Sequence, residues 1–575
     1  MPQRVEFRLA ESSFDQPIAQ SIWAQKYQYR KNRRDVDRDV TDTWRRVAHG
    51  LALAEPEDKR AQTARVFQSA MEGFKLLPAG RILAGCGTDR NVTLSNTFVM
   101  QTIDDSVEGI METAKQAALT MQMGGGLGYD FSTIRPKGAY VSGLDCPAAG
   151  PIAAMEIFDS VCAMIVQGMG RGAMMATMRC DHPSIEDFVN AKSDPSKLRN
   201  FNLSVMVTDA FMEAVESDAM WNLTWDGQVV RRIAARDLWQ MIMTRTYEAA
   251  EPGVLFIDRI NAMNPLNYLE DISATNSCAE QPLPPNGTCP LASINLARLV
   301  RNPFTAEAQL DVEELRRLAG VAVHMLDNSI EVSRFANELQ RQEALSKRRI
   351  GVGLTAVADA LVMVGVTYGT EAAADMVGEW MRIVQNAAYR KSAELAETRG
   401  AFPAYDPAAH QDHPMIARLD PDVRRLIMRY GLRNGALTSI APTGTISMFA
   451  GNVSSGIEPV FSRSYTRYIT NADGSKRTER VEDYALWLFR RQFGPSADLP
   501  DAFVTAMDLD PMDHVKMQAA VQHWVDSGIS KTVNCPEQIP FDAFKDVYRY
   551  AFESGCKGCT TFRPNATTGS ILAVS

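Results

Sequence analysis

The chain has 575 residues, of which 45% are hydrophobic, and it can therefore bury a large core. Its formal charge of −9 at pH 7 argues against a surface that binds nucleic acid or an anionic membrane. The charge does not argue against a small phosphorylated ligand, which needs only a local basic or amide-rich pocket.

The cysteines and the apolar segments predict a soluble protein of a reducing compartment. The nine cysteines are an odd number spread along the chain, which does not fit a disulfide scaffold. The first residues mix charges and contain no apolar run of signal-peptide type. The longest near-apolar stretch, residues 350–369, contains Asp359 and four glycines, and we interpret it as a buried helix with its connection. We therefore expect a cytoplasmic protein without a membrane span.

Residues 15–78 carry apolar side chains at helical spacing, such as Trp44, Val47 and Leu51, with charged residues between them. This pattern predicts an N-terminal helical region over residues 1–77. The region contains no glycine-rich nucleotide signature and is short for an ATP-binding regulatory domain.

From residue 78 onward, short β-compatible runs alternate with long helical patterns, as at residues 312–335 and 371–399. The runs cover residues 95–100, 202–207, 254–257, 293–296 and 437–440. Such alternation predicts parallel strands joined by crossover helices. No repeat or linker divides the segment, so we expect one dominant α/β domain over residues 78–575.

An amide, a thiol and a carboxylate stand at alternate positions in Asn276, Cys278 and Glu280, and Cys289 follows. The surrounding threonine, serine and proline residues favour extended or turn backbone over helix. In an extended segment, residues two apart project to the same side, so the three groups can converge on one small molecule. The alternative is a buried structural cysteine in a polar loop.

Glu280 restricts the chemistry that Cys278 can perform. A neighbouring carboxylate raises the pKa of a thiol and disfavours the thiolate that ionic attack or metal binding requires. The nearest histidines in the chain, His182 and His324, are too distant in sequence to be expected to reverse this effect. A thiol that stays neutral is suited to giving and taking hydrogen atoms.

Three other segments have both a functional and a structural interpretation. The glycine run that contains Gly125 and Gly126 matches neither a P-loop nor a complete dinucleotide fingerprint; it favours close approach of backbone amides to a ligand, or a tight turn. Residues 442–447 offer amides and hydroxyls that suit phosphate, or an ordinary helix N-cap. Cys556 and Cys559 have the spacing of half a zinc or redox site, but no second pair accompanies them, so we interpret both as structural.

These features occur together with further motifs. The motifs are residues 123–132 (MGGGLGYDFS), 172–176 (GAMMA), 200–205 (NFNLSV), 348–351 (RRIG), 441–447 (APTGTIS) and 558–565 (GCTTFRPN). In this order, and with the pattern around Cys278, nearly the whole chain resembles the large catalytic subunit of adenosylcobalamin-dependent (class II) ribonucleotide reductases. The resemblance implies a ten-stranded α/β barrel in which a central finger loop, at about residues 274–292, carries Cys278.

The resemblance also implies the radical source. Class I enzymes pass the radical through paired tyrosines near the last barrel strand, where this chain has Thr560, Thr561 and Phe562. Glycyl-radical enzymes carry an Arg-x-x-Gly-Tyr-like C-terminal loop, which the surroundings of Gly569 do not match. Adenosylcobalamin is the remaining generator, and we expect it as the cofactor.

By resemblance, the reaction is the reduction of ribonucleotides, with diphosphates expected, to 2′-deoxyribonucleotides. Cys278 would abstract the 3′ hydrogen, Glu280 would accept the 3′ hydroxyl proton, and Asn276 would orient the ribose hydroxyls. Cys289 would supply a reducing equivalent. The residues expected to bind substrate are Asn96, Gly125, Gly126, Pro442, Thr443, Gly444, Thr445 and Ser447.

The second redox cysteine of the family is expected at position 97, where this chain has Thr97. Threonine cannot form a disulfide. Three outcomes stay open: Cys86 substitutes, an external non-thiol reductant such as formate replaces the cysteine pair, or the chain is a divergent or inactive nucleotide-binding paralogue.

The resemblance finally implies regulation and partners. Gln167, Gly168 and Arg171 lie in the expected specificity loop for a deoxynucleotide effector, and helices at about residues 105–170 are expected to form a homodimer interface. The chain shows no C-terminal cysteine pair. We therefore expect a thioredoxin-type reductant or a separate tail protein as partner, and no nucleic acid or membrane.

Overall fold

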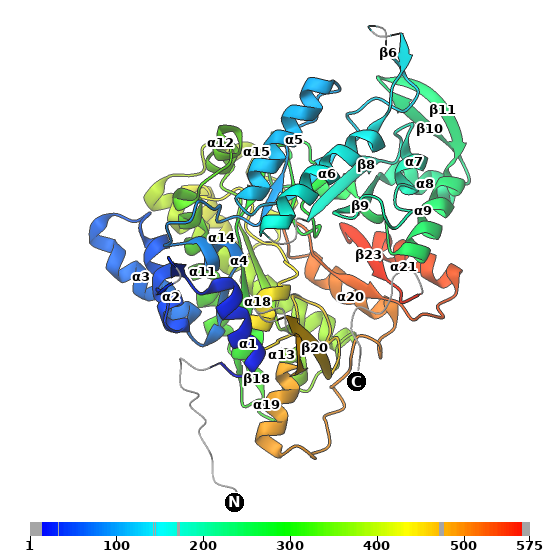
Figure 1. The fold of residues 1–575 in the computed structure, drawn as a ribbon. Helices are drawn as coiled ribbons and strands as arrows, with labels where there is room; N and C mark the ends of the chain where they lie inside the picture. Colours follow the sequence, from blue (N-terminus) through cyan, green and yellow to red (C-terminus); the bar gives the residue numbers. More distant parts are fainter. Residues whose placement is uncertain are drawn as a thin grey trace, which may run out of the picture.

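The structure is a computed structural model that describes residues 14–32, 34–141, 143, 145–169, 173–470 and 476–565 (Figure 1). Its helices are α1 (Pro17–Ile22), η1 (Trp23–Tyr27), α2 (Val40–Ala52), α3 (Glu57–Met71), η2 (Glu72–Phe74), α4 (Gly80–Gly85), α5 (Val107–Gln122), α6 (Pro151–Met169), α7 (Ile185–Val189), α8 (Asp209–Glu216), α9 (Ala235–Ala249), α10 (Ile257–Ala262), η3 (Leu296–Arg298), α11 (Val312–Val332), α12 (Glu338–Lys347), α13 (Val357–Met363), α14 (Glu371–Arg399), α15 (Pro407–Gln411), α16 (Pro414–Ala417), α17 (Pro421–Tyr430), α18 (Gly444–Phe449), α19 (Tyr484–Phe493), α20 (Pro511–Gln522) and α21 (Phe541–Glu553).

The strands are β1 (Arg30–Lys31), β2 (Arg34–Asp35), β3 (Leu76–Pro78), β4 (Thr97–Val99), β5 (Gly126–Asp130), β6 (Tyr140–Val141), β7 (Cys146–Pro147), β8 (Met174–Arg179), β9 (Phe201–Val207), β10 (Met220–Trp225), β11 (Gln228–Ala234), β12 (Gly253–Phe256), β13 (Ala274–Thr275), β14 (Pro282–Leu283), β15 (Thr288–Cys289), β16 (Leu291–Asn295), β17 (Val300–Arg301), β18 (Gln309–Leu310), β19 (Gly351–Thr355), β20 (Ser464–Thr470), β21 (Lys476–Glu482), β22 (Thr532–Asn534) and β23 (Gly558–Phe562).

The N-terminal region is mainly helical, as predicted. Helix α2 begins where the Asp39 side chain accepts a hydrogen bond from the Asp42 backbone N–H, and it buries Trp44 and Val47 completely. Three short strands depart from the helical prediction: β1 and β2 form a small hairpin, and β3 pairs with β16. The last strand of this region therefore ties it to the central sheets.

The largest sheet has eight strands in the order β15-β4-β5-β8-β9-β12-β23-β22. Strands β4, β5, β8, β9 and β12 run parallel to one another. Strand β15 pairs antiparallel with β4 at one edge, and β23 pairs antiparallel with β12 before continuing parallel to β22. The predicted parallel strands with crossover helices are therefore present.

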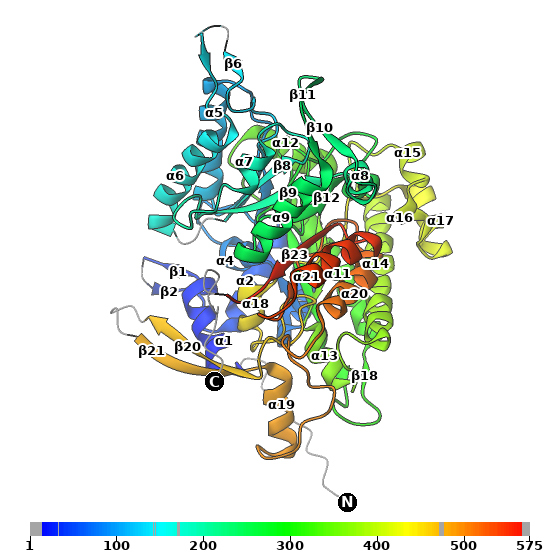
Figure 2. The same ribbon diagram turned by 90° about the vertical axis from the view of Figure 1, so that its right-hand side faces the viewer.

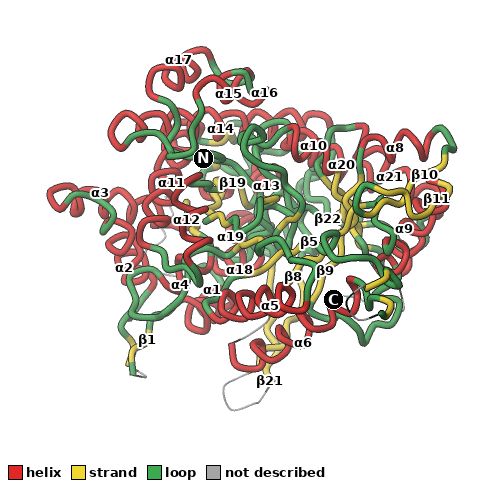
Figure 3. Tube along the Cα trace, turned by 90° about the horizontal axis from the view of Figure 1, so that it is seen from above, coloured by secondary structure: helices red, strands yellow, loops and turns green. Residues whose placement is uncertain are grey.

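A second sheet has the order β19-β16-β3, with β16 parallel to β19. The run at residues 437–440 was expected to be a strand, but it makes only single bridges, from Thr438 to Val352 and from Ile440 to Ile529. Seen from above, β5, β8, β9, β19 and β22 lie in the interior and long helices lie around them (Figure 3). The whole is a mixed α/β structure, and Figure 2 shows the same arrangement from the side.

The apolar stretch at residues 350–369 was expected to be a buried helix with its connection, but it begins as a strand. It contains β19, buried along its whole length, and then α13. A strand buried on both faces reads as a continuous apolar run, and so does a buried helix, so periodicity does not separate the two. In the part of the chain that the structure describes, no helix is long and apolar enough to cross a membrane.

Candidate active site

Cys278 lies at the tip of a loop between β13 and β14, which pair antiparallel and carry the loop toward the interior. The tip is a turn and not an extended strand, because the Ala279 N–H donates to the Asn276 carbonyl at 3.1 Å. Ala279 has a φ of +64°, in the left-handed region that residues with a side chain seldom adopt. The turn exposes Cys278 and buries Asn276 and Glu280 on either side of it.

Asn276 mainly stabilises this turn. Its Oδ1 accepts a hydrogen bond from the Gln281 backbone N–H at 2.9 Å, and its own N–H donates to the Gln281 carbonyl at 3.1 Å. An amide side chain that binds neighbouring backbone in this way favours turns over strands. The residue types that predicted convergence therefore also determine the local fold.

Glycines of the neighbouring strand let the loop pass closely. A Cβ on Gly128 would lie 1.9 Å from the Thr275 carbonyl oxygen, so no other residue fits in β5 at that point. Gly126 lies beside Ser277, and its N–H donates to the Asn96 carbonyl at 2.7 Å. The predicted substrate residues Asn96 and Gly126 are thus neighbours of the Cys278 loop, whereas Gly125 packs against Phe98.

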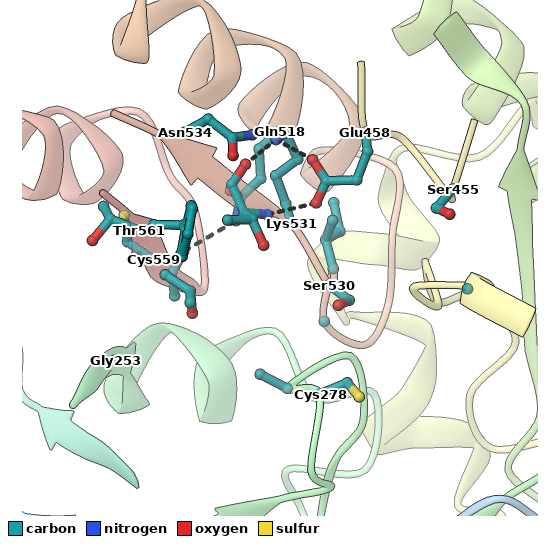
Figure 4. A pocket seen from close by; sticks show the side chains of 18 of the residues that line it. Gly253, Cys278, Ser455, Glu458, Gln518, Ser530, Lys531, Asn534, Cys559 and Thr561 are labelled. Atoms are coloured by element: carbon teal, nitrogen blue, oxygen red, sulfur yellow. Dashed lines mark hydrogen bonds and ion pairs between the residues drawn. The ribbon is translucent and has the colours of Figure 1, made fainter. Parts of the chain in front are cut away.

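A cavity of about 790 Å³ lies over the loop tip. Figure 4 shows Cys278 across this cavity from Glu458, Gln518 and Lys531. Gln518 belongs to α20, and Lys531 directly precedes β22. Cys278 is accessible from the cavity although protein surrounds it. Among the other residues predicted for the site, Gly444 and Ser447 also line the cavity.

The electrostatics of the pair agree with the expectation for a neutral thiol. Burial, reinforced by the Glu280 carboxylate, raises the pKa of Cys278 to about 12. Burial also raises the pKa of Glu280 to about 7, although Asn276 opposes the shift. The Glu280 Oε2 atom is buried without a hydrogen-bond partner among the described residues. Cys278 is therefore a thiol at neutral pH, and Glu280 can take up or release a proton there.

Thr97 and Cys289 face each other. They are paired residues of the antiparallel strands β4 and β15, and the Thr97 hydroxyl donates to the Cys289 carbonyl at 2.8 Å. Cys289 is fully buried, and burial raises the pKa of its thiol. Cys86 is buried against α2, where its thiol contacts the Val47 carbonyl, and it belongs to a different core cluster from Cys289. The geometry therefore gives no support for the replacement of Thr97 by Cys86.

The predicted phosphate segment begins α18 and contains a buried hydroxyl cluster. Thr443, with a φ of +52°, places its hydroxyl 2.9 Å from that of Thr355 and 2.8 Å from that of Ser447, and it accepts the Gly456 N–H. Its hydroxyl is thus engaged inside the protein. Gly444 and Thr445 are exposed, and Pro442 is partly buried. The surface that can meet a ligand is therefore the first turn of α18.

The residues predicted to bind an effector are only partly described. Gln167 and Gly168 belong to the last turn of α6, and Arg171 lies outside the described residues. The expected helices at about residues 105–170 are present as α5 and α6.

Sequence reasoning did not find several cavity residues. Lys531 is fully buried, binds Glu458 and donates to His514 Nδ1 at 2.9 Å, and burial lowers its pKa. Asn202 lines the cavity from β9. For Lys531 the available signal was a lysine between the apolar residues Ile529 and Val533, since lysine is seldom buried without a partner; Asn202 belongs to the motif at residues 200–205.

Comparison with protein families identifies the chain. The family model described as "Ribonucleotide reductase, barrel domain" matches residues 95–562. The chain belongs to the ribonucleotide reductase family. A second model of the family, described as "Ribonucleotide reductase, all-alpha domain", matches residues 13–91.

Curated relatives point to one branch of the ribonucleotide reductases. A protein of Mycobacterium tuberculosis (strain CDC 1551 / Oshkosh), named vitamin B12-dependent ribonucleoside-diphosphate reductase, is 37% identical over 90% of this chain and 74% of its own length. A protein of the same name from Thermoplasma acidophilum is 34% identical over 88% of this chain and 66% of its own. The vitamin B12-dependent ribonucleotide reductase of Streptomyces coelicolor is 26% identical over 85% and 58%. The resemblance to vitamin B12-dependent reductases is thus confirmed.

Proposed function

We propose that the protein is a vitamin B12-dependent ribonucleotide reductase that converts ribonucleotides, and in particular ribonucleoside diphosphates, to 2′-deoxyribonucleotides. The observation that carries the proposal is the neutral Cys278 thiol, which lies beside Glu280 and opens to a cavity of about 790 Å³. It stands at the tip of a loop that passes close to the glycines of β5. A cavity of this size suits a small-molecule ligand. No observation supports an inactive paralogue.

Each residue of the loop has a distinct part. Cys278 loses its hydrogen atom and then takes the 3′ hydrogen of the ribose, which a neutral thiol can do without forming a thiolate. Glu280 accepts the proton of the 3′ hydroxyl, and a pKa of about 7 suits a base that works near neutral pH. Asn276 holds the turn and orients the ribose hydroxyls. The first turn of α18, with the exposed residues Gly444 and Thr445, receives the phosphates.

Adenosylcobalamin is the cofactor that fits the opposite wall of the cavity. Gln518 and Gln522 line that wall, and their Oε1 atoms are buried without hydrogen-bond partners among the described residues. Unpaired buried acceptors favour a ligand with N–H donors, and the corrin ring carries several primary amides. When bound, the cofactor supplies the oxidant that removes the hydrogen atom from Cys278.

The reduction of the ribonucleotide depends on the Cys289 thiol and on a second reducing group that this chain does not supply. Reduction consumes two electrons, and Thr97 opposite Cys289 has no thiol to contribute. We assign the missing equivalent to a thioredoxin-type reductant or to a separate tail protein. This assignment keeps Cys289 as the internal thiol of the site.

The order of strands supports a closed ten-stranded barrel over residues 78–575, preceded by the helical region 1–77. Five parallel strands (β4, β5, β8, β9, β12) meet β23 on one side through antiparallel pairing with β12. On the other side, β15 pairs with β4 and leads, after Pro290, into β16. Strands β16 and β19, residues 437–440 and residues 529–534 would complete the second half beside β23.

The proposed assembly is a homodimer through α5 and α6, with a deoxynucleotide effector bound near the end of α6, where Gln167 and Gly168 lie, and by Arg171, which follows in the sequence. Val107 and Met111 on α5 and Met164 on α6 are 80%, 53% and 64% exposed. Large apolar side chains at such exposure on neighbouring helices favour a contact with another protein surface. A second copy of the chain supplies an apolar surface of the same kind.

Turnover of a nucleoside diphosphate tests the proposal. Cytidine diphosphate, adenosylcobalamin and dithiothreitol are incubated in the dark with the protein or with Cys278→Ala, and deoxycytidine diphosphate is measured. We expect product from the wild type and none from the variant, although the variant still binds the nucleotide. Cleavage of the cobalt–carbon bond without formation of deoxynucleotide would refute the proposed reductase activity, but it would still support a radical site at Cys278.

A further inference from the structure

Two peptide carbonyls of the Cys278 loop, one directly before Cys278 and one two residues after it, are held by groups from other parts of the chain. The Ser277 carbonyl accepts a hydrogen bond from Asn202 Nδ2 at 2.9 Å. The Glu280 carbonyl accepts two, from Ser439 Oγ at 3.0 Å and from the Gly528 N–H at 2.9 Å. The thiol is thus fixed from both sides by residues far from it in sequence.

Asn202 approaches from the first group of parallel strands. It lies on β9 opposite Met175 of β8, and its side chain is exposed to the cavity that also receives Cys278. Its carboxamide can donate to Ser277 through Nδ2 while Oδ1 stays on the side of the cavity. A ligand in the cavity would therefore lie next to the group that holds the loop.

Ser439 and Gly528 approach from the other side. A Cβ on Gly528 would lie 2.4 Å from the Ala279 carbonyl oxygen, so only glycine allows this contact. The segment that presents Gly528 is itself anchored, because Lys557 Nζ donates to the Asp526 and Ser527 carbonyls. The Asp526 carboxylate in turn accepts backbone N–H groups of residues 437 and 438, next to Ser439.

We propose that Asn202 on one side, and Ser439 with Gly528 on the other, form a clamp that positions the Cys278 sulfur between substrate and cofactor. The three are positioning residues, since they act through the loop and not on the reacting atoms. The inference rests on the proposed function. Hydrogen-atom transfer needs near contact of the reacting atoms, and a shift of about 1 Å can cost about 100-fold in rate. The left-handed conformation of Ala279 is costly for a residue with a side chain, and the clamp adds to the Asn276 contacts that hold it.

Asn202→Asp tests the clamp with almost no change in shape. The carboxylate cannot donate to the Ser277 carbonyl and repels it, so kcat for cytidine diphosphate should fall about 10- to 100-fold. Because Asn202 faces the cavity, the added charge should also raise the KM for the anionic substrate, whereas Ser439→Ala adds no charge and should leave the KM within about twofold of the wild type. The rate of cobalt–carbon bond cleavage, followed by absorbance, should fall together with kcat.

Thr177→Val is the matched control. Thr177 is fully buried, and its hydroxyl donates to the Ser273 carbonyl at 2.8 Å, at the base of the same loop and away from its tip. The control should lower thermal stability as much as Asn202→Asp, or more, and leave both kcat and the cleavage rate within about twofold of the wild type.

The outcomes separate the clamp from the function on which it rests. A wild type without deoxynucleotide product removes both. A productive wild type whose kcat and cleavage rate are matched by Asn202→Asp overturns the clamp alone. Should Asn202→Asp fail to fold, Ser439→Ala decides: a several-fold loss of kcat at unchanged KM supports the clamp, and an unchanged kcat overturns it.

Discussion

Glu280 links the burial of the site to the pH dependence of the reaction. Burial raises its pKa to about 7, and only the carboxylate form can accept the 3′ hydroxyl proton. Activity should therefore rise with pH through about 7 and level off above it. A glutamate with its usual pKa of about 4.3 would give no change between about pH 6 and pH 8. The measurement is kcat/KM for cytidine diphosphate over this range.

Glu280→Gln is the control for this pH profile. The amide keeps the shape of the side chain and cannot accept the proton, so activity should drop about 100- to 10,000-fold. The residual activity should lose the rise near pH 7. A profile of the wild type that stays flat across that pH would show that Glu280 is not the base.

Replacing Thr97 by cysteine would give the site two thiols, because Thr97 lies opposite Cys289. Directly opposed residues of antiparallel strands have Cα atoms about 4.5–5.5 Å apart, within the range of about 4.4–6.8 Å that disulfides span. Thr97→Cys should therefore form a disulfide with Cys289. Two thiols supply the two electrons of one reduction, so the variant should make about one deoxynucleotide per chain without external reductant.

The thiol count checks this prediction independently. After a single turnover, denatured Thr97→Cys protein should show two fewer free thiols than before. Thr97→Ser and the double variant Thr97→Cys, Cys289→Ser should lose none and make no such burst. Product from Thr97→Cys with all thiols still free would mean that the electrons come from elsewhere.

At the scale of elements, the close contact between β5 and the Cys278 loop is a point of vulnerability. A Cβ at position 128 would lie 1.9 Å from a backbone oxygen, so Gly128→Ala must displace the loop or the strand. We expect a loss of about 1–3 kcal/mol or more in the free energy of unfolding, together with loss of turnover. Chemical denaturation and product formation measure the two effects.

Gly320→Ala is a suitable comparison for the glycine variant. Gly320 lies inside α11, and a Cβ added there would lie 3.8 Å from the Lys391 side chain, an ordinary contact distance. Alanine in a helix interior is favoured over glycine by about 0.5–1 kcal/mol, so this variant should be as stable as the wild type or more. Equal effects of the two substitutions would contradict the role given to Gly128.

Some helices and strands could be predicted from the sequence alone, and others could not. The long helices α11 and α14 follow from their periodicity. Strand β8 does not, because Thr177 is the one β-branched residue in its MMATMR run, and methionine and alanine favour helix. The pairing of β8 with β5 and β9 decides its conformation.

The residues of the candidate site also differ in whether the sequence could predict them. The neutral state of the Cys278 thiol was predictable, because a carboxylate two residues away raises the pKa of a thiol. Asn202, Ser439 and Gly528 were not, because they meet the loop only after distant strands have come together. The turn at Ala279 was also missed as such, since an alanine gives no signal of a left-handed backbone.

At the scale of the whole molecule, the exposed apolar faces of α5 and α6 predict the state of association. The two helices lie side by side on one face of the molecule (Figure 1), and Val107, Met111, Ile157 and Met164 are exposed on them. Burial of such side chains stabilises an interface by about 25 cal/mol per Å² of apolar area, before the costs of association. Light scattering at about 10 μM should therefore give a dimer of the 63.5 kDa chain.

Charged substitutions in this face should dissociate that dimer. Met111→Glu together with Met164→Glu places carboxylates where apolar contact is expected, so the scattering mass should fall to that of the monomer. Met428→Glu is the matched control, because Met428 is 67% exposed on α17, at the opposite side of the molecule from α5 and α6 in Figure 3. The control should remain dimeric. A wild type that stays monomeric at this concentration, or a control that dissociates as the double variant does, would remove α5 and α6 as the interface.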